Sequence, residues 1–179
     1  MAPYSTLLLS LLFVSLCPTL LFADSTDSAD EETVHLHFYI HFIENQTEVV
    51  VAKSDIRVPG SFYNFGSIVV VDNPLTEGIN ITSKPVGKAQ GFFSVMDSLT
   101  VVWSANLVFT TGEYNGSSLA ILGPDDITKP VREVSIVGGS GYFRRAQGHI
   151  LLKTVSVDFD TGDAEAEVDA YVHPWPAKK

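Results

Sequence analysis

From residue 34 onward, apolar and polar side chains alternate with a period of two, and runs of β-branched residues are separated by turn residues. This alternation is typical of β-strands, because successive side chains of a strand point to opposite faces of a sheet. No stretch after residue 24 sustains the apolar period of about 3.6 residues that a helix requires. The sequence therefore predicts an all-β chain in which helices are minor.

Nine segments are expected to form strands: 34–43, 48–52, 66–72, 86–95, 99–110, 117–122, 131–137, 149–158 and 164–172. The connections between them are short and rich in Gly, Pro, Asn and Asp, and they include 72–74 and 123–125. Consecutive antiparallel strands of this number close most simply into an up-and-down barrel, which removes exposed sheet edges. We predict such a barrel, and one of about eight strands can hold a single small ligand.

The N-terminal 23 residues carry no charged side chain and contain an apolar stretch at 7–16 that is too short to span a bilayer. They end at Ala23, before the polar Asp24, which predicts a secretory signal peptide cleaved between these two residues. Residues 24–33 are expected to form an acidic, disordered leader, and 34–179 to form one domain. The only cysteine, Cys17, would leave with the signal peptide, so we expect a disulfide-free secreted domain, stabilised in part by homo-oligomerisation.

Three Asn-x-Ser/Thr sequons fall in expected turns, where a glycosyltransferase could reach Asn45, Asn80 and Asn115. They support secretion. The formal charge is −10, from 21 acidic and 11 basic residues. Without clustered Lys or Arg, this balance argues against nucleic acid and anionic membranes as partners.

A glycine-rich segment, 137–148, contains four glycines and predicts a tight corner between two strands. Arg144 stands where a dinucleotide-binding loop would need its third glycine, and no long amphipathic helix follows, so we reject a nucleotide site. The pair His35 and His37 resembles the start of a cupin metal motif, but no correctly spaced partner follows. No metal, redox cofactor or hydrolase nucleophile is predicted.

Six motifs, in order along the chain, together resemble those of the plant dirigent family. They are Phe38-Tyr39-Ile40-His41, Val71-Asp72-Asn73-Pro74-Leu75-Thr76, Val86-Gly87-Lys88-Ala89-Gln90-Gly91, Gly112-Glu113-Tyr114-Asn115-Gly116-Ser117, Val131-Arg132-Glu133 and the segment 138–148. The resemblance implies an eight-stranded antiparallel barrel similar to allene oxide cyclase, assembled as a dimer or trimer and secreted to the apoplast. It also implies a role in directing the coupling or cyclisation of phenylpropanoid intermediates.

The chain departs from the family pattern at three places. Phe42 replaces an Asp, Gln147 replaces an Arg, and Asp72-Asn73-Pro74 replaces a longer acidic motif. The mature chain also lacks the cysteine pair of the lignan-forming members. We therefore place it outside the pinoresinol-forming branch.

The first strand puts Phe38 and Phe42 on one apolar face, which either lines a substrate pocket or fills the core of an empty barrel. We expect Arg144, Arg145 and Gln147 to reach the same pocket. If 141–147 is extended, Arg145 shares a face with Gln147; if it is a helical turn ended by Gly148, which we favour, Arg144 is the neighbour.

Three functions are weighed for this chain. In the preferred one, the barrel orients phenolic radicals or quinone methides that a separate laccase or peroxidase has generated, and so imposes stereochemistry without oxidising them. In the second, it is a cyclase or dehydratase in which Asp72, Asp125 and a nearby Arg assist quinone methide closure by acid–base catalysis. The third is a structural or defence role in the cell wall.

Overall fold

The computed structural model describes residues 33–59, 63–97 and 99–175. The predicted signal peptide, the Ala23–Asp24 cleavage site, Cys17 and most of the acidic leader lie outside these residues. Within the described part of the chain, no helix is both long and apolar enough to cross a membrane.

The described residues form nine β-strands and one short 3₁₀ helix, and all nine expected strands are present. They are β1 (Val34–Phe42), β2 (Glu48–Ala52), β3 (Ile68–Thr76), β4 (Pro85–Val95), β5 (Thr100–Phe109), β6 (Ser118–Asp126), β7 (Arg132–Ser140), η1 (Gly141–Phe143), β8 (Gln147–Val157) and β9 (Ala164–His173).

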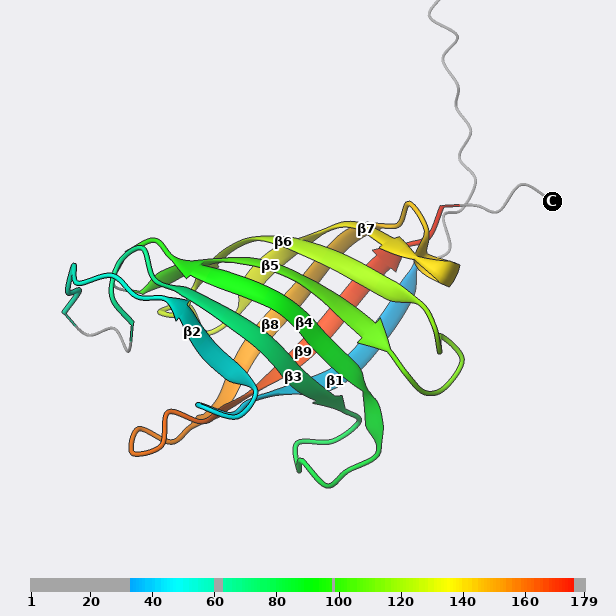
Figure 1. The fold of residues 1–179 in the computed structure, drawn as a ribbon. Helices are drawn as coiled ribbons and strands as arrows, with labels where there is room; N and C mark the ends of the chain where they lie inside the picture. The colour runs from blue at the N-terminus through cyan, green and yellow to red at the C-terminus, as the bar shows by residue number, and fades with distance from the viewer. Residues whose placement is uncertain (1–32, 60–62, 98, 176–179) are drawn as a thin grey trace, which may run out of the picture. The chain divides into compact units, whose positions relative to one another are not determined.

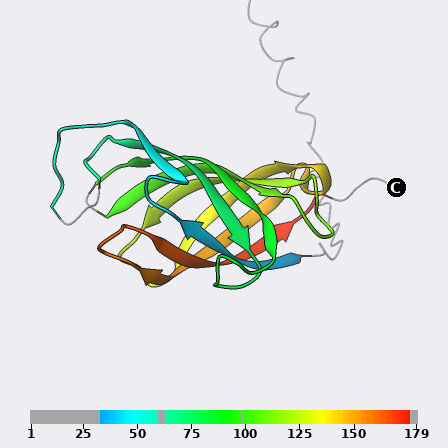
Figure 2. The same cartoon turned by 60° about the horizontal axis from the view of Figure 1, so that its bottom comes forward.

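The strands form one antiparallel sheet that closes on itself (Figures 1 and 2). The sheet runs in the order β1-β9-β8-β7-β6-β5-β4-β3, and β1 pairs again with β3 through Tyr39 opposite Thr76 and Ile40 opposite Leu75. Eight strands therefore close the barrel, as predicted. The remaining strand, β2, extends the sheet beyond this closure by pairing with β3.

Two proline-containing segments that we expected to be turns lie inside strands. Pro74 belongs to β3, where it falls between the residues that pair with β2 and those that pair with β1. Pro124 belongs to β6 but lies beyond Leu122, where the pairing with β7 ends. A proline has no N–H to donate, so both sit where one neighbouring strand makes no ladder contact.

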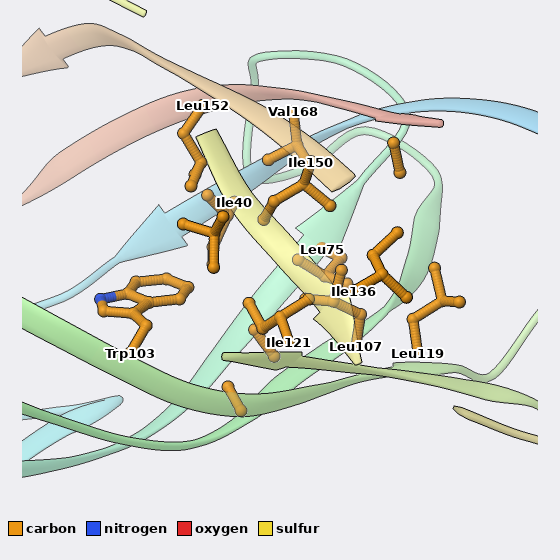
Figure 3. Close-up of a cluster of buried hydrophobic side chains, with 14 of the residues drawn as sticks. Ile40, Leu75, Trp103, Leu107, Leu119, Ile121, Ile136, Ile150, Leu152 and Val168 are labelled. Carbon is orange, nitrogen blue, oxygen red and sulfur yellow. The ribbon is translucent and has the colours of Figure 1, made fainter. Parts of the chain in front are cut away.

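Alternate side chains of every barrel strand fill the barrel interior. Figure 3 shows part of this core. On β9, for example, Ala166, Val168, Ala170 and Val172 are all buried. Removing a Leu or Ile side chain from water contributes roughly 1.5–3 kcal/mol. This packed middle section separates the two ends of the barrel.

The glycine-rich corner holds a helical turn, as we favoured, but the turn does not end at Gly148. The 3₁₀ helix spans Gly141–Phe143, Arg145 then adopts a left-handed φ of 64°, and β8 starts at Gln147. Gly148 instead lies within β8 with φ 143°, and a Cβ there would be 2.0 Å from the carbonyl oxygen of Tyr171. This glycine is required by the close approach of β9.

Candidate active site at one end of the barrel

A cavity of about 680 Å³ opens at the end of the barrel that lies to the left in Figure 1. The end of β1 and the β4–β5, β6–β7 and β8–β9 connections contribute its lining. A volume of this size is typical of sites for small organic ligands.

Aromatic rings form much of the cavity wall. Phe42, the last residue of β1, packs edge-on against Trp103 of β5, with ring centroids 5.7 Å apart. Tyr63 and Phe93 form a second edge-on pair at 5.5 Å. Such rings offer flat, polarisable surfaces for a planar phenolic ligand.

A buried ion pair lies on another part of the wall. Asp125 is near the end of β6 and Arg132 begins β7, so the short connection between these strands brings the two together. Arg132 Nε and Asp125 Oδ1 are 2.6 Å apart, and Arg132 Nη1 donates to Thr154 Oγ1 at 2.7 Å. Among the described residues, neither Nε nor Oδ1 has a well-aligned hydrogen bond, so the contact is a close ion pair.

Burial raises the pKa of the Asp125 carboxyl above its ordinary value, and the charge of Arg132 opposes that rise. A carboxyl that exchanges its proton at a higher pH is better matched to general acid catalysis near neutrality. A perturbed acid in a cavity is also a common mark of a functional site.

A second polar cluster lines the cavity near the end of β1. Tyr63 Oη donates to Glu44 Oε2 at 2.6 Å and lies 3.5 Å from Glu48 Oε2. Burial, together with the hydrogen bond to Glu44, raises the pKa of the Tyr63 hydroxyl, so Tyr63 stays protonated and acts as a donor. Burial also raises the pKa of Glu48.

Side chains behind this cluster hold Glu48 in place. Asn73 is fully buried and donates to Glu48 Oε1 at 3.0 Å, and Thr47 Oγ1 donates to Asn73 Oδ1 at 2.6 Å. Asn73 belongs to the segment that departs from the family pattern. Its side-chain amide supplies a hydrogen-bond donor to the buried Glu48 carboxyl.

The structure brings together only two of the predicted site residues, Phe42 and Asp125, which both line the cavity. Phe38 is buried deeper, packs edge-on against Phe109, and lines a smaller hollow of about 240 Å³ at the opposite end. Asp72 is on the outer surface, where hydrogen bonds from Lys88 and Gln90 lower its pKa. The expected catalytic role of Asp72 in this cavity is therefore wrong.

Arg144, Arg145 and Gln147 are exposed beside η1, at the end that lies to the right in Figure 1. Gln147 is opposite His173 at the end of β9, whereas Phe42 is opposite Ala164 at its start. The expectation that these residues share a pocket with Phe42 is wrong, because antiparallel pairing sends them to opposite ends of the barrel.

The remaining candidates lie on the surface. Asn45, Asn80 and Asn115 are exposed, and their glycosylation stays a prediction. His35 Nε2 and His37 Nδ1 lie on the outer face and contact one carboxylate oxygen, Asp169 Oδ1, at 2.8 and 3.0 Å.

Sequence reasoning missed Arg132, Glu44, Glu48 and Tyr63 as site residues. Glu44 is two residues after Phe42, so a continuation of the strand alternation could have placed it on the same side. No sequence pattern around Tyr63 indicated that its hydroxyl would contact Glu44 and Glu48.

Comparison with known proteins agrees with this architecture. The family model described as "Dirigent-like protein" matches residues 33–173. Pterocarpan synthase 1 of Glycyrrhiza echinata is 41% identical over 80% of this chain and 79% of its own, and Dirigent protein 21 of Arabidopsis thaliana is 39% identical over 79% and 77%.

Solved structures of two pterocarpan synthase dirigent proteins also match. One gives a TM-score of 0.76 at 38% identity, covering 82% of this chain and 87% of that one. The other gives 0.75 at 39% identity, covering 82% and 98%. Since the family model spans the whole barrel, and the fold and sequence agree throughout, this chain belongs to the dirigent family and lies outside its pinoresinol-forming branch.

Proposed function

We propose that this protein is a non-oxidising cyclase that removes water from a phenolic isoflavonoid alcohol and closes an ether ring through a quinone methide. The similarity to proteins named pterocarpan synthases supports this substrate class, because a pterocarpan is a ring-closed isoflavonoid. The observation that carries the proposal is the buried Asp125–Arg132 pair at an aromatic cavity.

The chemistry begins with loss of a benzylic hydroxyl. The protonated form of Asp125, which burial favours, gives its proton to that hydroxyl, the carbon–oxygen bond breaks, and water leaves. The phenol conjugated with the same carbon loses its own proton, so the species that remains is a neutral quinone methide. Arg132 holds the Asp125 carboxyl in position and stabilises the carboxylate that forms.

Ring closure returns both protons. A phenol oxygen of the second ring attacks the benzylic carbon, and its proton passes to the Asp125 carboxylate. The quinone oxygen takes a proton back and becomes a phenol again. One water is lost overall and no electrons are exchanged, so the reaction needs no oxidant.

The aromatic wall gives the site its stereochemical role. Phe42 and Trp103 fix the plane of one ring, so that the second ring reaches the quinone methide from one face. The same wall also suits the radical-coupling function that sequence analysis preferred, in which a separate laccase or peroxidase supplies phenoxy radicals. Dependence on an oxidase separates the two functions.

The test uses purified protein and an isoflavanol that has a benzylic hydroxyl and one free phenol on each ring. Wild-type protein is expected to form the cyclic ether without any oxidase, and Asp125→Asn to lose about 10²- to 10⁴-fold in rate. Glu133→Gln, on the exposed side of β7, is the matched control and should retain full activity. An Asp125→Asn protein as active as wild type would refute the proposed role of Asp125.

Secretion to the apoplast, glycosylation and assembly into a homo-oligomer are also part of the proposal. Secretion rests on residues 1–23, glycosylation on the three sequons, and oligomerisation on the disulfide-free mature chain and the resemblance to the dirigent family.

A further inference from the structure

The proposed reaction needs two separate proton-transfer positions, and Asp125 supplies only one of them. Asp125 serves the benzylic carbon, where the hydroxyl leaves and the attacking phenol arrives. The oxygen that becomes the quinone oxygen lies on the far side of the same ring, where it must first lose a proton and later regain it. A second group is therefore required across the cavity.

We propose that Glu44 is this second catalytic group, positioned by Tyr63 and Glu48. The inference rests on the proposed function and identifies how its site handles the quinone-forming phenol. Glu44 lines the same cavity as Asp125 but follows the end of β1, whereas Asp125 is on β6.

Glu44 is held from both its backbone and its side chain. Its N–H donates to Asp163 Oδ1 at 2.9 Å, and its Oε2 accepts the hydrogen bond from Tyr63 at 2.6 Å. The Tyr63 hydroxyl donates this hydrogen bond, so it fixes the orientation of the carboxylate that we assign to accept the phenolic proton.

Glu48 also lines the cavity, but it is only 6% exposed and its carboxylate is held by neighbouring side chains. It is the only buried residue of β2, and Asn73 holds its Oε1 while its Oε2 lies 3.5 Å from Tyr63 Oη. Burial raises the pKa of Glu48, and its Oε2 is a second, more distant acceptor for the Tyr63 hydroxyl, which donates to Glu44 at the shorter distance. Glu48 and Tyr63 are thus positioning residues.

The other carboxylates on the cavity lining are poor candidates for this work. Asp97 Oδ1 accepts the backbone N–H groups of Leu99 and Thr100 at 2.9 and 2.7 Å, and these bonds lower its pKa. Asp160 is exposed in the β8–β9 connection. Glu44 is the carboxylate that combines partial burial, a fixed orientation and contact with the cavity.

The first test compares Glu44→Gln, Glu44→Asp, Tyr63→Phe and Glu48→Gln with wild type on the isoflavanol described above. Each variant is first checked for native circular dichroism and melting. We expect Glu44→Gln to lose about 10²-fold in kcat, Glu44→Asp to recover part of that loss, and both positioning variants to lose less. Glu133→Gln and Tyr142→Phe, which change exposed residues away from the cavity, are the matched controls.

A fluorinated substrate shows whether the loss concerns a proton. Fluorine beside the quinone-forming phenol makes that phenol more acidic, so it depends less on a base. The defect of Glu44→Gln and of Tyr63→Phe should therefore shrink on the fluorinated isoflavanol. Equal defects on both substrates, or Glu44→Gln within twofold of wild type, would overturn the role of Glu44.

A binding measurement keeps this inference separate from the proposed function. Umbelliferone is a bicyclic phenol whose phenolate has its own absorbance band, so its ionisation can be followed when it is bound. Next to the Glu44 carboxylate its pKa should be higher than in water, and Glu44→Gln should reverse most of that shift. Failure of the wild-type protein to convert the isoflavanol would refute the proposed function. Identical titration of umbelliferone bound to wild type and to Glu44→Gln would refute the placement of Glu44.

Discussion

Arg132 Nε lies 2.6 Å from Asp125 Oδ1 on the neighbouring strand, and the two side chains are only 6% and 7% exposed. The ion pair closes the turn between β6 and β7 while it presents an acid to the cavity. The proposed function therefore makes stability and catalysis depend on the same two residues, and changing one partner or both separates the two effects.

Arg132→Met should reduce the free energy of unfolding by about 3 to 5 kcal/mol at pH 7, because it leaves a buried carboxylate without its partner. Loss of Arg132 also removes the interaction that lowers the pKa of Asp125, so the folded-state pKa rises further above the unfolded value of about 3.9. A group whose pKa is higher in the folded state makes its full contribution to the free energy of unfolding below its unfolded-state pKa. That contribution is lost as the pH rises through its folded-state pKa. Urea denaturation should therefore show a smaller defect at pH 4 than at pH 7.

The double variant Asp125→Asn with Arg132→Met is the control for that experiment. Removing both charges should recover most of the lost stability, since an uncompensated carboxylate is no longer buried. A defect of equal size at both pH values, with no recovery in the double variant, would show that the pair is not coupled.

Two glycines of the glycine-rich corner should respond differently to the same substitution. Gly148→Ala places a Cβ 2.0 Å from the carbonyl oxygen of Tyr171, at a φ of 143° that side chains rarely adopt. Gly138→Ala meets nothing within 4 Å. Thermal melting should show Gly148→Ala destabilised by at least about 2 kcal/mol and Gly138→Ala by well under about 1 kcal/mol. Similar melting temperatures for the two variants would contradict this placement of β8 against β9.

Phe42→Asp and Gln147→Arg should act independently, although both change positions that depart from the family pattern. Phe42 is at the cavity and Gln147 is near η1, at the other end of the barrel. Effects of distant sites usually add to within about 0.5 kcal/mol. Melting of both single variants and the double variant should show that Gln147→Arg rescues none of the stability lost in Phe42→Asp; a rescue would mean that the two positions meet.

Local alternation was enough to predict the strands and the closed barrel, because each strand buries every second side chain. It misplaced the segments around Pro74 and Pro124, since a proline normally ends a strand. Whether a missing N–H is tolerated depends on gaps in the pairing with neighbouring strands, and only the assembled sheet shows these gaps.

The site could be predicted only in part, for a similar reason. The departure from the family pattern singled out Phe42, but it gave no indication of which barrel end this residue would occupy. Gln147 was assigned to the wrong end because a resemblance between motifs does not say how far apart two residues lie in the folded barrel. Tyr63 meets Glu44 and Glu48 from a connection without regular structure, and no periodicity predicts such a contact.

The most direct test of the account is the anaerobic conversion of the isoflavanol by the purified protein, with oxygen-18 in the benzylic hydroxyl and product analysis by chiral chromatography. The proposed dehydration and ring closure should give one predominant enantiomer of the cyclic ether, with the label released as water and with no oxidase added. No conversion without an oxidase, together with stereoselective coupling of coniferyl alcohol when an oxidase is supplied, would contradict it and favour radical coupling.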